Sequence, residues 1–229
     1  MSNTISHTSH KINPYGLDSI DLIRFEPEHL FLRPKVVKAL AAFRKRGKEL
    51  GFDLRVESAY RSFDRQVSIW NRKAKRELPL LDAKGHLISK DIKNPEELVK
   101  TLLLWSALPG ASRHHFGTEI DIVDASAIPH GYAVKLTPEE SHKMFKPFHD
   151  WITEEAESFG FLRVFIPGRG SIQPEPWHLS YIEEARLFQE LFDLKELEAI
   201  YMDSDIASKS VLLENLEALA KDYIYPYFL

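Results

Sequence analysis

The sequence predicts an α+β fold, and three observations support this fold class. Residues 52–58 alternate apolar and polar side chains, and residues 118–123 are rich in β-branched ones, both of which are typical of strands. Proline beside acidic residues, as in residues 94–97, commonly marks the start of a helix. After Tyr181 the composition changes to residues that favour helices. The chain is therefore expected to combine a sheet with helices and to end in a helical extension.

The first predicted elements are two helices and a hairpin. A proline begins a helix over residues 34–49, whose apolar residues recur at helical spacing and which Gly51 ends. After the strand, Ser62 is the expected N-cap of a second helix that continues to about Arg76. Residues 78–90 place a turn sequence between short apolar pairs, which predicts a hairpin.

The middle of the chain contains two further helix starts. Residues 94–97 begin a helix that Pro109 ends. Residues 137–140 begin another helix, which Pro147 should kink or restart and Gly160 should end. Helices are thus expected on both sides of the strand over residues 118–123.

The domain organisation follows from where these elements fall. A further strand is expected over residues 162–166, before the helical tail. We predict an N-terminal arm over residues 1–25, a central domain over residues 26–182, and C-terminal helices over residues 183–229 that pack on the same domain.

The composition excludes several classes of function. A net charge of -4 provides no polycation for nucleic acid or anionic lipid, so neither partner is expected. No stretch approaches the roughly 20 apolar residues of a membrane span, and the N-terminus shows no export signal, so the chain as printed is expected to be cytoplasmic. The absence of cysteine limits any metal site to His, Asp and Glu ligands.

Two separated segments together offer the side chains of a catalytic zinc site. The first contains His114, His115 and Asp121, and the second contains Glu175 and His178. Such a site needs three protein ligands, an open position for water and a general base. Spacing alone does not choose between the two adjacent histidines.

Local sequence predicts how these side chains are presented. Gly117 favours a turn, followed by a strand in which Glu119 and Asp121 face one side and Ile120 the other. Prolines flank Glu175 on both sides, and a residue that precedes a proline is disfavoured in the α conformation. Glu175 is therefore expected on extended backbone. The zinc site is therefore expected on a sheet, and the helical H-E-x-x-H arrangement is excluded.

Three motifs in this order resemble the signature of the VanY-type D-alanyl-D-alanine carboxypeptidases. They are Ser58-Ala-Tyr-Arg-Ser62 with Gln66, Ser112-x-His114-x-x-Gly117-x-x-x-Asp121, and Glu175-Pro-Trp-His178. This family belongs to the metallopeptidase superfamily that also contains lysostaphin-type enzymes and the hedgehog amino-terminal domain. The resemblance covers about residues 52–181 and implies a hedgehog/DD-peptidase-like fold with a central, mostly antiparallel sheet.

The resemblance also implies the roles of individual residues. His114, Asp121 and His178 match the ligands of one Zn2+ ion, and Glu175 matches the catalytic base. Zinc lowers the pKa of its water to about 7, and a carboxylate can then take the proton during attack on the carbonyl.

Three further residues match positions that hold the substrate: Arg61, Gln66 and Ser112. Arg61 also precedes the N-terminus of a predicted helix, a favourable place for an anion, so a carboxylate clamp is expected. The competing interpretation is that Arg61 forms an ion pair with Glu57 or Asp64.

Glu119 departs from the family pattern, which usually has a small residue at this position. The residue is either a partner of a metal ligand or a side chain that narrows the substrate pocket.

The predicted activity is hydrolysis of the terminal D-Ala-D-Ala bond of a peptidoglycan stem peptide or muropeptide. The alternatives are an endopeptidase of the L-Ala-D-Glu type and a non-catalytic zinc-binding module of the same fold. Because peptidoglycan lies outside the cytoplasm, a periplasmic or cell-surface location is the alternative to a cytoplasmic one.

Overall fold

The structure of the protein is a computed structural model in which residues 12–229 are described. The α-helices are α1 (Pro34–Glu49), α2 (Phe63–Ala74), α3 (Pro95–Leu102), α4 (Pro138–His142), α5 (Lys146–Glu155), α6 (Ile182–Glu190), α7 (Leu194–Met202), α8 (Lys209–Glu214) and α9 (Leu216–Tyr223). The 3-10 helices are η1 (Arg113–Phe116), η2 (Ala125–Ala127), η3 (Ala156–Phe159) and η4 (Tyr225–Tyr227). The strands are β1 (Ile23–Phe25), β2 (Leu30–Leu32), β3 (Leu54–Ser58), β4 (Glu119–Asp124), β5 (Phe161–Leu162) and β6 (His178–Tyr181).

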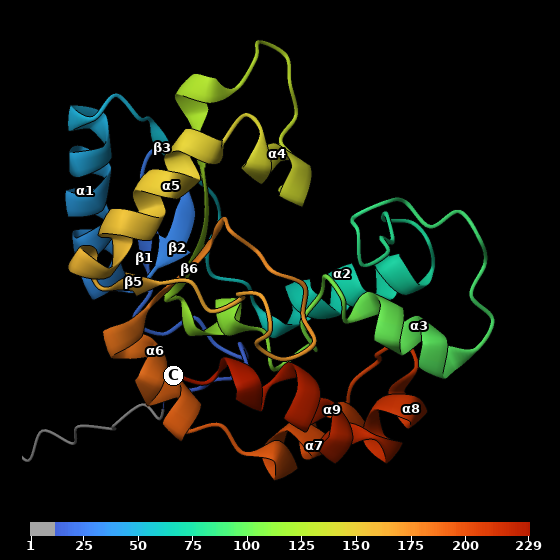
Figure 1. Cartoon of the computed structure of the whole chain (residues 1–229). Coiled ribbons are helices and arrows are strands. Elements are labelled where there is room, and N and C mark those ends of the chain that lie inside the picture. The colour runs from blue at the N-terminus through green and yellow to red at the C-terminus, as the bar shows by residue number, and fades with distance from the viewer. Residues whose placement is uncertain (1–11) are drawn as a thin grey trace, which may run out of the picture.

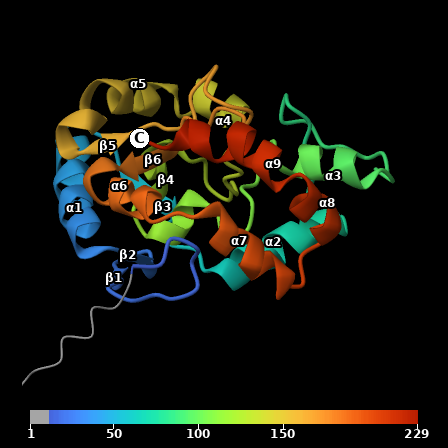
Figure 2. The ribbon, with the colours of Figure 1, turned by 90° about the horizontal axis from the view of Figure 1, so that it is seen from below.

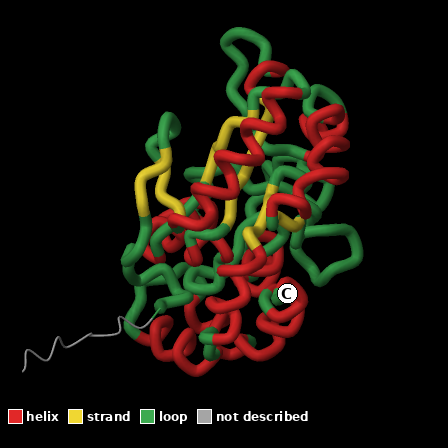
Figure 3. Tube along the Cα trace, turned by 90° about the vertical axis from the view of Figure 1, so that its left-hand side faces the viewer, coloured by secondary structure: helices red, strands yellow, loops and turns green. Residues whose placement is uncertain are grey.

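The strands form two sheets, which Figure 3 shows as separate sets. Strands β1 and β2 form an antiparallel pair, and the larger sheet has the order β3-β4-β6-β5 with every pair antiparallel. In the pairing of β4 with β6, Asp121 lies opposite His178 and Glu119 lies opposite Ser180. The register of two strands therefore brings together side chains that are far apart in sequence.

One face of the larger sheet packs against α1 and α5 (Figure 1). Ile120 and Ile122 of β4 are fully buried in this core, together with Phe43 of α1 and Trp151 of α5. The rings of Phe43 and Trp151 stack with their centroids 4.6 Å apart. Because alternate residues of a strand point to opposite faces, the burial of Ile120 and Ile122 directs Asp121 to the other face.

The second apolar core lies among α2, α3, α7, α8 and α9, as Figure 2 shows from below. Trp70 of α2 is fully buried in this core, and its indole Nε1 donates a hydrogen bond to the carbonyl of Ala207 at 3.1 Å. The C-terminal helices therefore pack mainly on α2 and α3. Among the described helices, none combines the length and the apolar character that a membrane span requires.

The fold class is confirmed, and several predicted elements have the predicted bounds. Helix α1 covers residues 34–49, and the hydroxyl of Ser62 caps α2 by accepting a hydrogen bond from the Arg65 amide at 3.2 Å. Pro147 lies where the chain restarts as α5, and Gly160 ends η3 with a positive φ of 84°.

Three elements are shorter than predicted. Helix α3 ends at Leu102, because the following segment leaves the helix to contact α2. Strand β5 ends at Leu162, because Arg163 turns toward α5 and donates a hydrogen bond to the His149 carbonyl. The hairpin expected over residues 78–90 is reduced to one bridge, between Leu81 and Leu87.

The predicted domain division stays a prediction. Residues 1–11 of the N-terminal arm lie outside the described residues, and the described part of the arm includes β1.

Candidate metal centre

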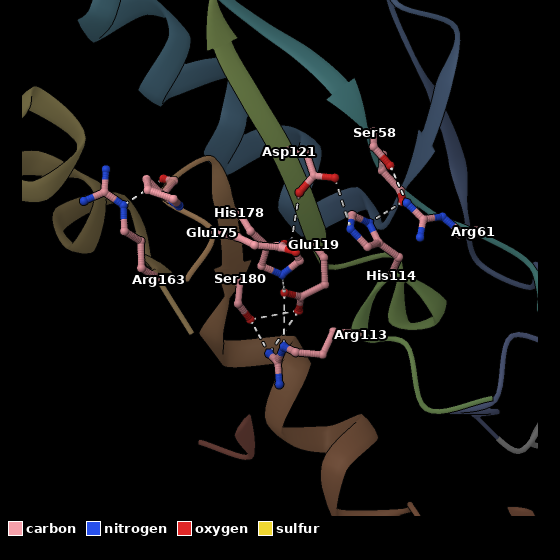
Figure 4. Close-up of polar contacts among 12 residues, drawn as sticks. Ser58, Arg61, Arg113, His114, Glu119, Asp121, Arg163, Glu175, His178 and Ser180 are labelled. Carbon is pink, nitrogen blue, oxygen red and sulfur yellow. Dashed lines mark hydrogen bonds and ion pairs between the residues drawn. The ribbon is translucent and has the colours of Figure 1, made fainter. Parts of the chain in front are cut away.

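Three buried side chains converge on the face of the larger sheet opposite α1 and α5 (Figure 4). His114 comes from η1, Asp121 from β4 and His178 from β6. The Nε2 atom of His114 lies 3.3 Å from Asp121 Oδ2, and the Nδ1 atom of His178 lies 3.0 Å from Asp121 Oδ1. One ligand atom from each residue lies within 4.8 Å of the others, so a single metal ion could contact all three.

A tight turn connects the first of these residues to the strand that carries the second. Gly117 has a left-handed conformation with φ of 71°, and its amide donates to the His114 carbonyl at 3.4 Å. Most residues avoid this conformation, whereas glycine adopts it at little cost. The turn therefore allows only two residues, Gly117 and Thr118, to separate η1 from β4.

The hydrogen-bond partners of the two imidazoles indicate which ring nitrogens carry protons. His114 Nδ1 lies 2.7 Å from the carbonyl of Ala59, and His178 Nε2 lies 2.9 Å from a carboxylate oxygen of Glu119. Both partners only accept, so these nitrogens donate. In the neutral imidazoles the remaining nitrogens are acceptors that face Asp121, itself an acceptor. A cation placed among them satisfies all three side chains, which is the arrangement that a zinc ion requires.

The electrostatic environment of His178 also favours a positive charge at this point. Burial opposes a charged imidazole, but the hydrogen bonds to Asp121 and Glu119 outweigh burial and raise the pKa of His178 to about 9. Burial likewise opposes ionisation of Asp121, but the charges and hydrogen bonds of His114 and His178 lower its pKa below the usual range. The carboxylates of Asp121 and Glu119 thus place negative charge around the buried imidazole of His178.

The structure distinguishes the two adjacent histidines. His115 Nε2 accepts a hydrogen bond from the Gly110 amide at 3.0 Å, and its Nδ1 donates to the Arg61 carbonyl at 2.6 Å. Both ring nitrogens are therefore occupied, and burial lowers the pKa of His115 to about 3. His115 fixes two loops to each other, and His114 is the histidine that faces Asp121.

Glu175 lies beside the three converging residues on extended backbone, as its flanking prolines predict. Its amide donates to the Phe165 carbonyl at 3.0 Å, and Arg163 Nε donates to the carbonyl of Pro176 at 2.9 Å (Figure 4). These bonds hold the loop so that Glu175 Oε2 lies 4.0 Å from His178 Nδ1. Burial raises the pKa of Glu175 to about 7.

A cavity of about 260 Å³ opens onto these residues. Its lining includes Arg61, Gln66 and Ser112 together with His114, Asp121, Glu175 and His178. Every site residue predicted from the sequence therefore lines the same cavity, although the residues come from three separate segments of the chain.

Arg61 is held in the cavity by neutral side chains. Its Nη1 donates to Gln66 Oε1 at 2.8 Å, and its Nη2 donates to Ser58 Oγ at 3.1 Å. Among the described residues Arg61 forms no ion pair with Glu57 or Asp64, so its charge is available to a ligand. Gln66 also donates through Nε2 to the carbonyl of Ala107 at 2.8 Å, which fixes its orientation.

Lys73 is another cationic residue of the cavity, and it was not predicted from the sequence. It lies seven residues after Gln66, two turns further along the same face of α2, and its Nζ donates to Ser106 Oγ at 2.6 Å. Burial lowers the pKa of Lys73 to about 8. The helical spacing was the signal that could have identified it.

Glu119 faces the same side of β4 as Asp121, but it lies behind His178. It is fully buried and is absent from the described residues that line the cavity. Burial alone would raise its pKa, but the Arg113 guanidinium and the hydrogen bond from His178 lower it to about 2. Arg113 and Ser180, which contact Glu119, were not identified from the sequence.

A family model described as VanY, D-alanyl-D-alanine carboxypeptidase, matches residues 29–184. This match covers more than half of the chain. The chain belongs to the VanY family. The family range includes every predicted site residue, and it begins and ends within a few residues of the predicted central domain.

One curated relative and two solved structures are similar to this chain. A D-alanyl-D-alanine carboxypeptidase of Enterococcus faecalis is 28% identical over 130 residues, which are 56% of this chain and 39% of that protein. A structure of VanYB in complex with D-Alanine-D-Alanine is 22% identical, with a TM-score of 0.54 over 79% of this chain and 88% of that one. A vancomycin-resistance D,D-pentapeptidase VanY in complex with Zn(II) is 23% identical, with a TM-score of 0.53 over 80% and 92%. The two structures show that the fold is shared.

Proposed function

We propose that this chain is a zinc-dependent D-alanyl-D-alanine carboxypeptidase that hydrolyses the terminal D-Ala-D-Ala bond of peptidoglycan stem peptides. The observation that carries the proposal is the position of Asp121 between His114 and His178, with Glu175 beside them in one cavity. Membership of the VanY family supports it, as do the D-Alanine-D-Alanine and Zn(II) complexes of similar structures.

The proposed ligands are His114, Asp121 and His178, which would leave one coordination position open. When bound, zinc supplies a Lewis acid for the scissile carbonyl and for the attacking water. The imidazole of His114 is oriented by the carbonyl of Ala59, which accepts a hydrogen bond from its far nitrogen.

Glu175 is the proposed general base. Its carboxylate takes the proton of the attacking water and then passes a proton to the leaving amine. Because burial raises its pKa to about 7, Glu175 both accepts and releases a proton near neutral pH. The hydrogen bonds of the surrounding loop fix its backbone and so limit the ways in which the carboxylate can turn from the cavity.

The terminal carboxylate of the substrate is the proposed ligand of the cationic side of the cavity. Arg61 and Lys73 supply the positive charges, and the hydroxyl of Ser112 lines the same cavity. Gln66 uses both ends of its amide on Arg61 and Ala107, so it acts by holding the guanidinium in place. Two cations beside the base favour substrates that end in a free carboxylate over internal peptide bonds.

Release of D-alanine from a defined pentapeptide that ends in D-Ala-D-Ala tests the proposal. The zinc-loaded protein should release one D-alanine per peptide. The Glu175→Gln variant should lose about 10²–10⁴-fold in kcat, the range of general-base contributions, while its zinc content stays unchanged. Unchanged activity would remove Glu175 as the base.

A second substrate separates the two alternative functions. Cleavage of an internal L-Ala-D-Glu bond without D-alanine release would establish an endopeptidase. If the protein bound zinc stoichiometrically and cleaved neither substrate, it would be a non-catalytic module.

A further inference from the structure

A buried polar cluster lies behind His178, on the side away from Asp121 (Figure 4). Its centre is Glu119, which accepts hydrogen bonds from four side chains; two of these bonds come from Arg113, whose Nε also donates to Oε2 at 3.3 Å. Glu119 accepts hydrogen bonds from His178 Nε2 at 2.9 Å, Ser180 Oγ at 2.8 Å, Thr118 Oγ1 at 2.9 Å and Arg113 Nη2 at 3.1 Å. Both oxygens of this carboxylate are therefore occupied.

The strand register places this cluster beside the metal centre. Glu119 lies two residues before Asp121 on β4, and the strand pairing sets Glu119 opposite Ser180 and Asp121 opposite His178. His178 thus has one carboxylate at each ring nitrogen, Asp121 at Nδ1 and Glu119 at Nε2. Because Glu119 is absent from the described residues of the cavity wall, it has no direct route to a substrate.

We propose that Glu119 is a positioning residue that fixes the tautomer and the orientation of His178, so that Nδ1 presents its lone pair to the metal ion. The proposal rests on the proposed function, in which His178 is a zinc ligand. A carboxylate that accepts the far N–H of a metal-bound imidazole also makes that imidazole more basic, which strengthens the metal bond.

Arg113 is the counter-ion that makes a carboxylate possible here. The Arg113–Glu119 pair has side chains only 5% and 0% exposed, and a buried carboxylate without a counter-ion would be strongly unfavourable. Arg113 also donates through Nη1 to the carbonyl of Tyr227 at 2.8 Å, so η4 contributes a further contact that fixes the guanidinium. Glu119, Arg113 and the C-terminal segment act as one unit that supports His178.

Zinc affinity, measured by competition with a chromophoric chelator, tests this assignment separately from catalysis. Glu119→Ala should weaken zinc binding about 10–100-fold, the range for residues that support a metal ligand. Glu119→Gln keeps the shape of the side chain but removes its charge, and it should give a smaller loss. Glu28→Gln is the matched control, because Glu28 is another arginine-paired carboxylate that lies outside the cavity lining, and it should bind zinc as the native protein does.

The nitrogen resonances of the imidazole provide a second measurement that a purely structural role would not change. In the zinc-loaded native protein, 15N spectra should show His178 protonated at Nε2 alone, and Glu119→Gln should shift this Nε2 resonance. Circular dichroism spectra identical to those of the native protein would show that the variants fold.

The His178→Ala variant distinguishes the two possible failures. If His178→Ala binds zinc as tightly as the native protein, the proposed function fails. If His178→Ala loses zinc but both Glu119 variants keep native affinity and an unchanged Nε2 resonance, the function stands and the role of Glu119 is overturned.

Discussion

Arg61 and Lys73 both line the cavity, but only Lys73 of the two titrates near neutral pH. Arginine keeps its charge at all pH values at which proteins are stable, whereas burial lowers the pKa of Lys73 to about 8. Lys73 is therefore charged below pH 8 and neutral above it. The terminal carboxylate of the substrate should therefore bind more tightly when the Lys73 amine is protonated.

The pH dependence of kcat/KM should show this titration, because kcat/KM reports the ionisation of the free enzyme. For a D-Ala-D-Ala peptide, kcat/KM should decrease as the pH rises through about 8, where Lys73 loses its proton. The substrate carboxylate has a pKa near 3.5 and does not change in this range. Initial rates between pH 6 and 10 would measure the effect.

Two variants of Lys73 control for other titrating groups. Lys73→Arg should keep a charge throughout the range and should lose the decrease near pH 8. Lys73→Met should give a low kcat/KM that still rises through about pH 7, as Glu175 loses its proton, but shows no decrease near pH 8. A decrease of unchanged size in Lys73→Met would assign the titration to another group.

At the scale of residues, the sequence predicts side chains that belong to a spaced motif and misses those that meet only in the folded chain. His114, Asp121 and Glu175 stand in recognisable patterns. Arg113 lies within the motif, at a position that the motif leaves open, and it meets Glu119 and the Tyr227 carbonyl only through the strand and the C-terminal segment. Nothing in local spacing indicates that contact.

Among the elements, the turn between η1 and β4 has the closest connection to the metal centre. A β-carbon at Gly117 would lie 2.5 Å from Leu22 Cδ2, and the left-handed φ of 71° costs other residues about 1–2 kcal/mol. Gly117→Ala should therefore lower the free energy of unfolding by more than 1 kcal/mol and weaken zinc binding. Urea denaturation of the zinc-free protein and chelator competition measure the two effects.

Gly51→Ala separates backbone strain from steric overlap. Gly51 has a φ of 91°, but an added β-carbon would meet no atom within 4 Å. In this variant the free energy of unfolding should fall by about 1–2 kcal/mol, and zinc should bind as in the native protein. Native zinc affinity in Gly117→Ala would show that the turn does not determine the position of His114.

Element bounds were predictable where the sequence contains a terminating residue. Gly51 and Gly160 end helical segments close to the expected positions, and Ser62 caps α2. Helix α3 and strand β5 end early, because residues just beyond them contact other elements. The pattern of apolar residues carries no information on tertiary contacts, so predictions from the sequence overestimate the length of both elements.

At the scale of the molecule, the metal centre lies between two apolar cores. The sheet with α1 and α5 provides Asp121 and His178, and the core around Trp70 contains α2, which provides Gln66 and Lys73. The family resemblance predicts the sheet, but the packing of the C-terminal helices on α2 depends on contacts that no motif describes. The cavity requires both cores in their native arrangement.

Zinc should therefore stabilise the whole molecule. A ligand at about a hundred times its Kd adds about 2.7 kcal/mol to the free energy of unfolding, which raises Tm by about 5–10 °C in a chain of this size. Thermal denaturation with a chelator and with excess zinc measures the shift. In Asp121→Ala the shift should disappear; an equal shift in that variant would place the stabilising ion elsewhere.

The bond between Arg113 and the Tyr227 carbonyl has a consequence for how this family diversifies. A relative without the C-terminal helices would expose the guanidinium to solvent, and its ion pair with Glu119 would then balance the buried carboxylate less well. Positions 113 and 119 should therefore change together with the C-terminal segment: an acidic residue at 119 should accompany the helices, and a small residue should accompany their loss. Aligned relatives sorted by the presence of these helices would reveal that covariation.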